Sequence, residues 1–450
     1  MNPATQVLVV AHTFPPSPEI GARRIASFCR HLPGFGIRPI VVTVNKQCLL
    51  QRDDSFPASE GVRIESTSEM TNPLLWYGRL KKRIRSGSSD ARSVAHEAGP
   101  RTASPRQGRG FVRRQVLTLL ETPDRHLAWF LPAARAAARL IKSERIAVVF
   151  SSGPPWTNHL VARHLRKKYG IPWVADFRDP WAPTQSDKPP WASTLHYTME
   201  ASCVQWADLI VCNTEALRQE FVARYPAVPG SRFVVLTGGF DGSITLPAIP
   251  KGPKGSRRIL LHLGDIYLRR RIDTFCQSVQ SLIDSRKIEP NSLQVRFVGE
   301  VDPMVKLAAG RVLSDLTAAK VIEFIPRMNW QAGQHLLWGA DLLLLFQGDY
   351  KIQVPAKFYE YLQTGKPIFA VAAKGALTEL LDSTGSGIWA DPGDARGMGA
   401  GLLRALELPA ISPEEAARRW SGQFHYRSLT AQLASWISQL ATRPLPGLCL

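Results

Sequence analysis

Cysteine is scarce in this sequence, and its distribution argues against a disulfide framework. The six cysteines form no CxxC pair, and several lie in apolar runs. We therefore expect reduced core thiols of a cytoplasmic protein, and we do not expect these residues to bind a metal. Long hydrophobic runs are missing too: because no stretch of about 18 apolar residues occurs, we expect no membrane-spanning helix. The N-terminus enters an apolar strand at Gln6 without the basic and apolar regions of a signal peptide.

Signatures of several enzyme classes are also absent. The sequence contains no Walker A loop, no HExxH, no GxSxG and no cluster with the spacing of a zinc site. The loop that follows the first predicted strand has a single glycine, Gly21, and no GxGxxG pattern, so a dinucleotide is not indicated. No repeat of about 20–50 residues is apparent beyond two similar halves.

Acidic residues are in the minority, with 37 Asp and Glu against 56 Lys and Arg and a net charge of +19. Such an excess indicates an acidic partner, which could be nucleic acid, anionic lipid or a phosphorylated substrate. The stretch from Arg79 to Arg114 contains eleven basic and two acidic residues, and it directly follows the apolar stretch Leu74 to Tyr77. We interpret 74–114 as a segment that could lie on anionic lipid, with a solvated basic loop as the alternative. No nucleic-acid motif accompanies the charge, so nucleic acid is not expected.

The length and composition predict two globular domains. The chain has 450 residues, of which 44% are hydrophobic and 21% charged. Apolar runs alternate with helical patterns in both halves, which is typical of parallel sheets. A stretch rich in proline and glycine separates the halves. We predict a first domain over 1–245 with a basic insertion near 70–125, a linker over 246–258, a second domain over 259–425 and a terminal helix over 426–450.

The stretch 349–381 concentrates the functional signals of the second half. An apolar run ending at Phe346 predicts a buried strand, and a helix follows it from Val354 and Pro355. Lys357 and Glu360 would thus lie near a helix start at the carboxyl end of a parallel strand, where ligands of α/β sheets bind. The alternative is a solvated Lys357–Glu360 pair, worth only a few tenths of a kcal/mol.

Charged residues follow three other predicted strands. Arg23 and Arg24 follow the first strand, and Gly264 followed by three arginines (269–271) predicts a diphosphate clamp. In both places the alternative is a basic surface turn. The strand ending at Asp176 leads into Arg178 and Asp179, for which the alternative is a local ion pair that shapes the loop.

These stretches resemble a known family. VPAKFYEYL followed by TGKPI resembles the donor-binding region of GT-B glycosyltransferases of family 4, in which two glutamates are separated by seven residues. The second glutamate falls on Glu360, which the resemblance assigns to the ribose hydroxyls of the donor. The first falls on Ile352 and is missing, so Gln353 or Asp349 would have to replace it. PPSPEIGARRIASF and SSGPPWTNHL…IPWVADFRDPWA are similar to the acceptor-side loops, although the histidine that several relatives carry near Arg178 is absent.

The resemblance implies an α/β protein with the GT-B fold, two Rossmann-like domains whose parallel sheets face a central cleft. It implies a glycosyltransferase that moves a sugar from a nucleotide-sugar donor to a saccharide or lipid-linked acceptor, with retention and with neither metal nor cofactor. Cell-surface polysaccharide or glycolipid synthesis in the cytoplasm, with or without attachment to the inner membrane face, is the implied setting. Two alternatives stay open: a nucleotide-sugar epimerase, and an inactive GT-B module that binds an anionic partner.

The expected site residues fall into three groups. The catalytic candidates are Arg178, Asp179, Arg270 and Lys357. The donor-binding candidates are Gly264, Arg269, Arg270, Arg271, Pro326, Arg327, Gln353, Val354, Pro355, Lys357 and Glu360. The acceptor-side candidates are Glu19, Gly21, Arg23, Arg24, Ser152 and Asp176.

Overall fold

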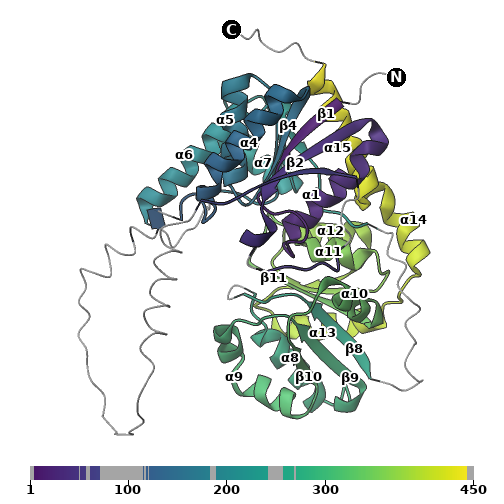
Figure 1. The fold of residues 1–450 in the computed structure, drawn as a ribbon. Helices are drawn as coiled ribbons and strands as arrows, with labels where there is room; N and C mark the ends of the chain where they lie inside the picture. Colours follow the sequence, from purple (N-terminus) through teal and green to yellow (C-terminus); the bar gives the residue numbers. More distant parts are fainter. Residues whose placement is uncertain are drawn as a thin grey trace, which may run out of the picture.

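The chain contains two sheets of parallel strands, one above the other in Figure 1. The computed structural model describes residues 5–49, 51–56, 61–70, 115, 118–119, 121–182, 189–241, 257–267 and 270–442. The segment 74–114, which we interpreted as lipid-facing, therefore lies wholly outside the described residues. The predicted α/β architecture with two sheets of parallel strands is confirmed.

The first sheet has seven strands in the order β3-β2-β1-β4-β5-β6-β7, and all its neighbouring strands are parallel. Its strands are β1 (Thr5–Val10), β2 (Ile37–Val44), β3 (Arg63–Thr67), β4 (Ile146–Gly153), β5 (Trp173–Phe177), β6 (Leu209–Cys212) and β7 (Phe233–Val235). Helices α4 (Phe130–Ser143), α5 (Thr157–Tyr169), α6 (Pro190–Trp206) and α7 (Glu215–Arg224) bury apolar side chains against one face. Helices α1 (Ile20–His31) and α15 (Tyr426–Ala441) cover the other.

The second sheet repeats the winding with six strands in the order β10-β9-β8-β11-β12-β13. Its strands are β8 (Arg258–Leu263), β9 (Leu293–Val298), β10 (Ile322–Ile325), β11 (Leu342–Gly348), β12 (Ile368–Ala372) and β13 (Gly387–Ala390). One face packs on α8 (Asp273–Asp284), α9 (Pro303–Ala318) and α13 (Ala395–Glu407). The other packs on α10 (Trp330–Gly339), α11 (Ala356–Leu362), α12 (Ala376–Thr384) and α14 (Pro413–Phe424).

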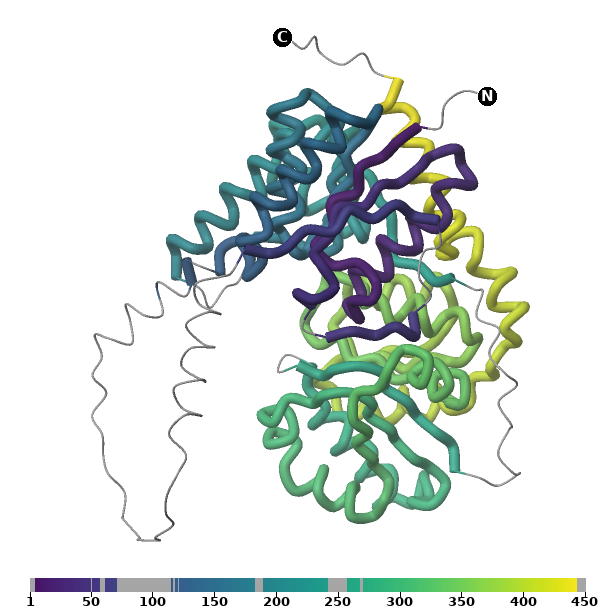
Figure 2. The backbone as a smooth tube through the Cα atoms, viewed as in Figure 1, coloured from purple at the N-terminus to yellow at the C-terminus, as the bar shows by residue number. Residues whose placement is uncertain are grey.

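The chain passes from one domain to the other twice, and the two connecting segments contact each other. Phe240, just after β7, forms an isolated parallel bridge with His425, between α14 and α15. The Phe240 N–H donates to Phe424 O at 2.9 Å, and the Tyr426 N–H donates to Phe240 O at 2.9 Å. Beyond this point α15, yellow in Figure 2, runs back along the first domain, where Leu433 and Ile437 join the core of the first sheet.

Two local details are worth noting. The N-cap residue of α5 is Trp156, and the hydroxyl of Thr157 donates to Asp124 Oδ1 at 2.8 Å. Of the five described cysteines, all free, four are buried, whereas Cys48 is exposed. No helix among the described residues is long and apolar enough to cross a membrane.

In both sheets the strand order reverses next to the first strand, between β1 and β4 and between β8 and β11. The carboxyl ends of strands at such a switch point open a crevice, because the connections on either side run to opposite faces of the sheet. The fold therefore directs the loops after β1, β4, β8 and β11 into one space between the domains.

Candidate active site in the interdomain cleft

A cavity of about 880 Å³ lies between the domains, and its wall combines both switch points. Loops after β1 and β4 supply Glu19, Gly21 and Pro154 from the first domain. Loops after β8 and β11 supply Gly264, Arg270 and the start of α11 from the second. The charged lining consists of seven Lys or Arg and five Asp or Glu side chains, so positive charge is in slight excess, which suits an anionic ligand.

Lys357 is held by a chain of hydrogen bonds on the second-domain side. Its ammonium lies 3.2 Å from His262 Nε2, and His262 Nδ1 lies 2.9 Å from the carbonyl oxygen of Leu344 in β11. Nδ1 must therefore carry the imidazole proton, and Nε2 accepts from the ammonium. Burial, and then the nearby Arg270, lower the pKa of Lys357 to about 7. The protonation of Lys357 near neutral pH is thus sensitive to the charge of a ligand bound beside it.

Gly264 makes room for that lysine. Its φ of +116° suits glycine alone, and a Cβ at this position would lie 2.6 Å from the Lys357 Nζ. A side chain here would displace the ammonium. The turn after β8 and the first turn of α11 are therefore built to fit each other.

The three arginines predicted as a clamp separate in the structure. Arg270 lines the cavity, its Nε is buried without a hydrogen-bond partner, and burial lowers its pKa. Arg271 is exposed and forms an ion pair with Asp273 instead, so the structure does not bring it to the cavity. Arg269 lies outside the described residues.

Glu360 faces the first domain across the cleft. One of its carboxylate oxygens lies 3.5 Å from Nη1 of Arg23 in α1, and both side chains are about one-fifth exposed, at 22% and 20%. Because Lys357 bonds to His262, the structure does not show the alternative in which Lys357 and Glu360 pair on the helix surface. Val354 and Pro355 line the cavity beside them.

The remaining donor-side candidates lie at the rim or outside it. Arg327 lines the cavity, pairs with Asp265, and donates to Gln51 Oε1 of the first domain at 2.9 Å. Pro326 is exposed. Gln353 donates to Asp179 Oδ1 at 2.9 Å and so bridges the domains, whereas Asp349 is exposed. The positions of Gln353 and Asp349 do not identify a replacement for the missing first glutamate.

Three of the acceptor-side candidates form a buried structural network. Arg24 binds Asp176 through two hydrogen bonds, of 3.1 and 2.9 Å, and also donates to the carbonyl oxygens of Leu236 and Thr237. Ser152 donates to Asp176 at 2.6 Å. Burial opposes ionisation of Asp176, but the Arg24 charge and hydrogen bonds hold its pKa below the usual value. Because the polar atoms of Ser152 and Asp176 are occupied, these two residues position α1 and do not present themselves to a ligand.

The hydrogen bonds of Arg178 go to backbone carbonyl oxygens, and not to Asp176 or Asp179 as in the alternative of a local ion pair. Arg178 donates to the carbonyl oxygens of Gly153, at 3.3 Å, and Pro154, and its Nη1 is buried without a partner. The guanidinium lies against Gly21, where an added Cβ would be 1.6 Å from Nη1. Burial lowers the pKa of Arg178 and raises that of Asp179. Both residues line the cavity with Glu19 and Gly21, so the structure brings these four candidates together.

A loop of the first domain also caps a helix of the second, which the sequence did not indicate. The N–H of Trp330, the first residue of α10, donates to Asp53 Oδ2 at 2.7 Å, and the N–H of Gln331 donates to Ser55 Oγ at 3.2 Å. Phe56 packs edge-on against Trp330 with ring centroids 5.3 Å apart. These contacts hold the described domain arrangement closed on the side of β10.

Comparisons with known proteins bear on the family and on the fold. Residues 21–239 match the family described as glycosyl transferase 4-like domain. A D-inositol 3-phosphate glycosyltransferase of a Nocardioides species is 25% identical over 282 residues, which is 58% of this chain and 60% of that relative. The chain thus matches less than two thirds of that relative's length.

Solved structures match nearly the whole chain. Sucrose-phosphate synthase from Thermosynechococcus elongatus superposes with a TM-score of 0.63 at 14% identity, over 97% of this chain and 99% of that one. Anabaena Alr3699/HepE in complex with UDP and glucose gives a TM-score of 0.61 at 12% identity, over 97% and 100%. At these identities the likeness shows a shared two-domain fold.

Proposed function

We propose that the chain is a family 4 glycosyltransferase with a GT-B fold, which transfers a sugar from a nucleotide-sugar donor to a saccharide or lipid-linked acceptor. The match of residues 21–239 to the glycosyl transferase 4-like domain supports the family, and the solved structures support the fold. The donor would bind on the second-domain side of the cleft and the acceptor on the first-domain side. The solved complexes of Anabaena Alr3699/HepE with UDP and glucose and with UDP-glucose support a sugar nucleotide as the donor class.

The observation that carries this proposal is the pair of cations Lys357 and Arg270 on the cavity wall at the β8/β11 switch point. Negative charge develops on the nucleoside diphosphate as the bond to the sugar breaks, and cations fixed in a partly dehydrated cleft stabilise it strongly. Both cations have lowered pKa values because burial disfavours their charge. A diphosphate would supply the opposite charge that each of them lacks.

We further propose that transfer proceeds with retention, and that the diphosphate needs neither metal nor cofactor. The two cations provide the positive charge that a divalent metal would otherwise supply. If the acceptor attacks on the face of the leaving group, no enzyme nucleophile is required. Glu360 would then accept hydrogen bonds from the ribose hydroxyls, in place of its long contact to Arg23.

A lipid-linked acceptor would give the basic stretch 74–114 a purpose, since attraction to anionic head groups would keep the enzyme at the inner face of a membrane. We propose this cytoplasmic, peripheral setting from the sequence of that stretch alone. Synthesis of a cell-surface polysaccharide or glycolipid is the process that such an acceptor implies.

The decisive experiment incubates the protein with a panel of nucleotide sugars and measures release of nucleoside diphosphate with and without lipid-linked acceptor. Acceptor-dependent release with retained anomeric configuration is expected. Turnover of donor without acceptor would instead indicate an epimerase, and binding without turnover an inactive module.

Glu360→Ala should weaken donor binding by about 1.5–3 kcal/mol, because the ribose hydroxyls lose a charged acceptor. Glu379→Ala, in α12, is the matched control on another helix. Unchanged donor affinity in a folded Glu360→Ala protein would reject the role of this residue.

A further inference from the structure

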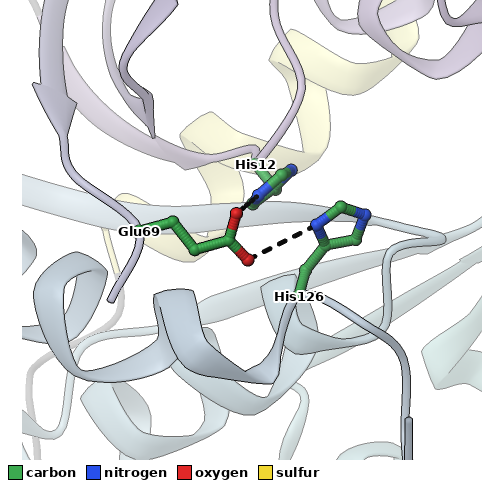
Figure 3. A group of neighbouring side chains, drawn as sticks. All are labelled: His12, Glu69 and His126. Carbon is green, nitrogen blue, oxygen red and sulfur yellow. Dashed lines mark ion pairs between the residues drawn. The ribbon is translucent and has the colours of Figure 1, made fainter. Parts of the chain in front are cut away.

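Two histidines and a glutamate from separate parts of the first domain meet at the cleft. His12 follows β1, Glu69 follows β3 by two residues, and His126 precedes the short 3-10 helix η3 (Leu127–Trp129). Figure 3 shows both rings directed at the Glu69 carboxylate. His12 and His126 line the cavity beside Arg125. None of the three residues belongs to the proposed donor site.

The distances within this cluster do not fit ordinary hydrogen bonds. His12 Nε2 lies 3.7 Å from Glu69 Oε2, and His126 Nδ1 lies 3.7 Å from Glu69 Oε1. A hydrogen bond between such groups would be about 2.7–2.9 Å long. In a tetrahedral site with ligand bonds of about 2.0–2.1 Å, neighbouring ligand atoms are about 3.4 Å apart. The observed separations are closer to that spacing.

The ligand atoms are also left without other partners. Both nitrogens of His12 and Nδ1 of His126 are buried and make no hydrogen bond. The side chain of His12 is 4% exposed and that of His126 14%. A buried polar atom without a partner costs about 1–3 kcal/mol. His12 Nε2 and His126 Nδ1 are two such atoms beside one carboxylate, which indicates a ligand that satisfies both together.

The surrounding structure holds the cluster in place. The N–H of His12 donates to Asn158 Oδ1 at 2.9 Å, and its carbonyl oxygen accepts from Val44 N and Thr43 Oγ1. The ring of Trp129 stands edge-on to His12, with centroids 5.2 Å apart. Asp124 accepts from the N–H of His126 at 2.9 Å and from Thr157. Such outer contacts fix the ligands of metal sites.

The spacing of the two rings suits a cation held between neutral imidazoles. The rings of His12 and His126 lie 3.9 Å apart between centroids, which disfavours a positive charge on both. Neutral imidazole and ionised carboxylate are the forms that bind metals.

We propose that His12, Glu69 and His126 bind a divalent transition-metal ion, with Zn²⁺ as the ion that best fits two imidazoles and a carboxylate. Three protein ligands leave a fourth position open, as in catalytic zinc sites. Because both histidines line the cavity, that position faces the cleft, where a water molecule or an acceptor hydroxyl or phosphate oxygen would occupy it. The ion would also tie together the loops after β1 and β3 on the acceptor side.

Binding through Nδ1 of His126 places its proton on Nε2, which now accepts from Arg125 Nε at 3.1 Å. Arg125 must therefore turn away when the ion binds. Since this arginine contact is exposed, the rearrangement is cheap. Arg125→Ala should therefore retain or tighten metal binding.

A second histidine cluster provides an internal control. His31 Nε2 lies 2.8 Å from Asp241 Oδ1, and Asp241 also accepts from Ser27 at 2.6 Å and Arg30 at 2.8 Å. These are normal hydrogen-bond lengths, and the carboxylate is already occupied. His31 thus belongs to a polar cluster at the domain crossing, next to His425, and we do not propose a metal there.

The test is calorimetric titration of the full-length, chelator-stripped protein with ZnCl₂ at pH 7.5. We expect one equivalent to bind in the wild type and in His31→Ala. Affinity should fall by about 100-fold or more in Glu69→Gln and in His126→Ala, which remove a ligand each. Circular dichroism establishes that each variant is folded.

Cobalt provides an independent readout, since Co²⁺ in a four-coordinate N/O site gives intense visible absorption that should vanish in Glu69→Gln. Zinc affinity equal in wild type and Glu69→Gln, absence of a stoichiometric site in the wild type, or loss of binding in His31→Ala instead would each overturn the proposal. None of these outcomes depends on glycosyl transfer, so they are separate from the test of the proposed function.

Discussion

The lowered pKa of Lys357 makes donor binding sensitive to pH in a predictable direction. In the free protein, burial and Arg270 lower this pKa to about 7. A diphosphate beside the ammonium would raise it again, because opposite charge favours the protonated form. Below pH 7 the lysine is already charged, so its protonation does not limit binding. Above pH 7 the free protein has lost this proton, and the ligand can bind well only when the proton is taken up.

The size of the effect follows from the pKa. Each pH unit above 7 costs about 1.4 kcal/mol, or a factor of about 10 in affinity, until the pKa of the bound state is reached. Because half of the free protein has already lost this proton at pH 7, we expect the affinity for UDP to fall by about 50-fold between pH 7 and pH 9. Calorimetry in buffers of different ionisation enthalpy should also detect the uptake of nearly one proton at pH 9.

Matched variants assign this behaviour to one side chain. Lys357→Arg keeps a charge that does not titrate in this range, so its affinity should be nearly constant between pH 7 and pH 9. Lys351→Arg, on the exposed turn before α11, should retain the wild-type profile. A flat profile in the wild-type protein, or a wild-type slope in Lys357→Arg, would refute the assignment of the lowered pKa to a diphosphate-binding lysine.

Three further predictions concern the first domain. Gly21→Ala should leave the protein folded by circular dichroism but lower transfer about 10–100-fold, because the methyl group displaces Arg178; wild-type turnover would contradict this. Glu200→Ala should destabilise the fold by about 3–5 kcal/mol in urea unfolding, since the fully buried Glu200 accepts from Arg224 at 2.7 Å, and Glu200→Gln should cost less. The protein should sediment with anionic vesicles but not with neutral ones. This binding should weaken at about 1 M salt, where the Debye length is about 3 Å, and in a protein with glutamine at positions 81, 82, 83 and 85. Equal sedimentation with both vesicle types would reject the proposed attachment to anionic lipid.

The elements around the donor site could be predicted because their signals are local. An apolar run followed by a polar loop and Val354–Pro355 predicted β11 and α11, and both form there. The turn after β8 was recognised from Gly264 and the arginines that follow. Which arginine faces the cavity could not be predicted, because that depends on Asp273 attracting Arg271 and on the packing of Tyr267 near Arg270.

Contacts between distant residues were beyond the reach of the sequence. Arg24 and Asp176 are 152 positions apart, so nothing in the sequence distinguishes a buried pair from two ligand-facing charges. His12, Glu69 and His126 have no motif spacing, and His262 reads as an ordinary strand residue. The one available signal was position, since His12 directly follows the first strand at the edge where sites of this fold form.

Polar contacts between the two domains across the cleft determine which interactions a bound donor would have to break. Arg23 lies 3.5 Å from Glu360, a long contact between partly exposed groups that is worth little. Gln353 and Asp179 meet at 2.9 Å, and Asp53 receives the Trp330 N–H at 2.7 Å, so these two contacts are the stronger ones. Any opening of the domains about the Phe240–His425 bridge has to break the strong pairs. If Glu360 binds the donor ribose as proposed above, a ribose entering between Arg23 and Glu360 would displace only the weak contact. The proposed donor would then enter its site at small cost while the rest of the closed arrangement persists.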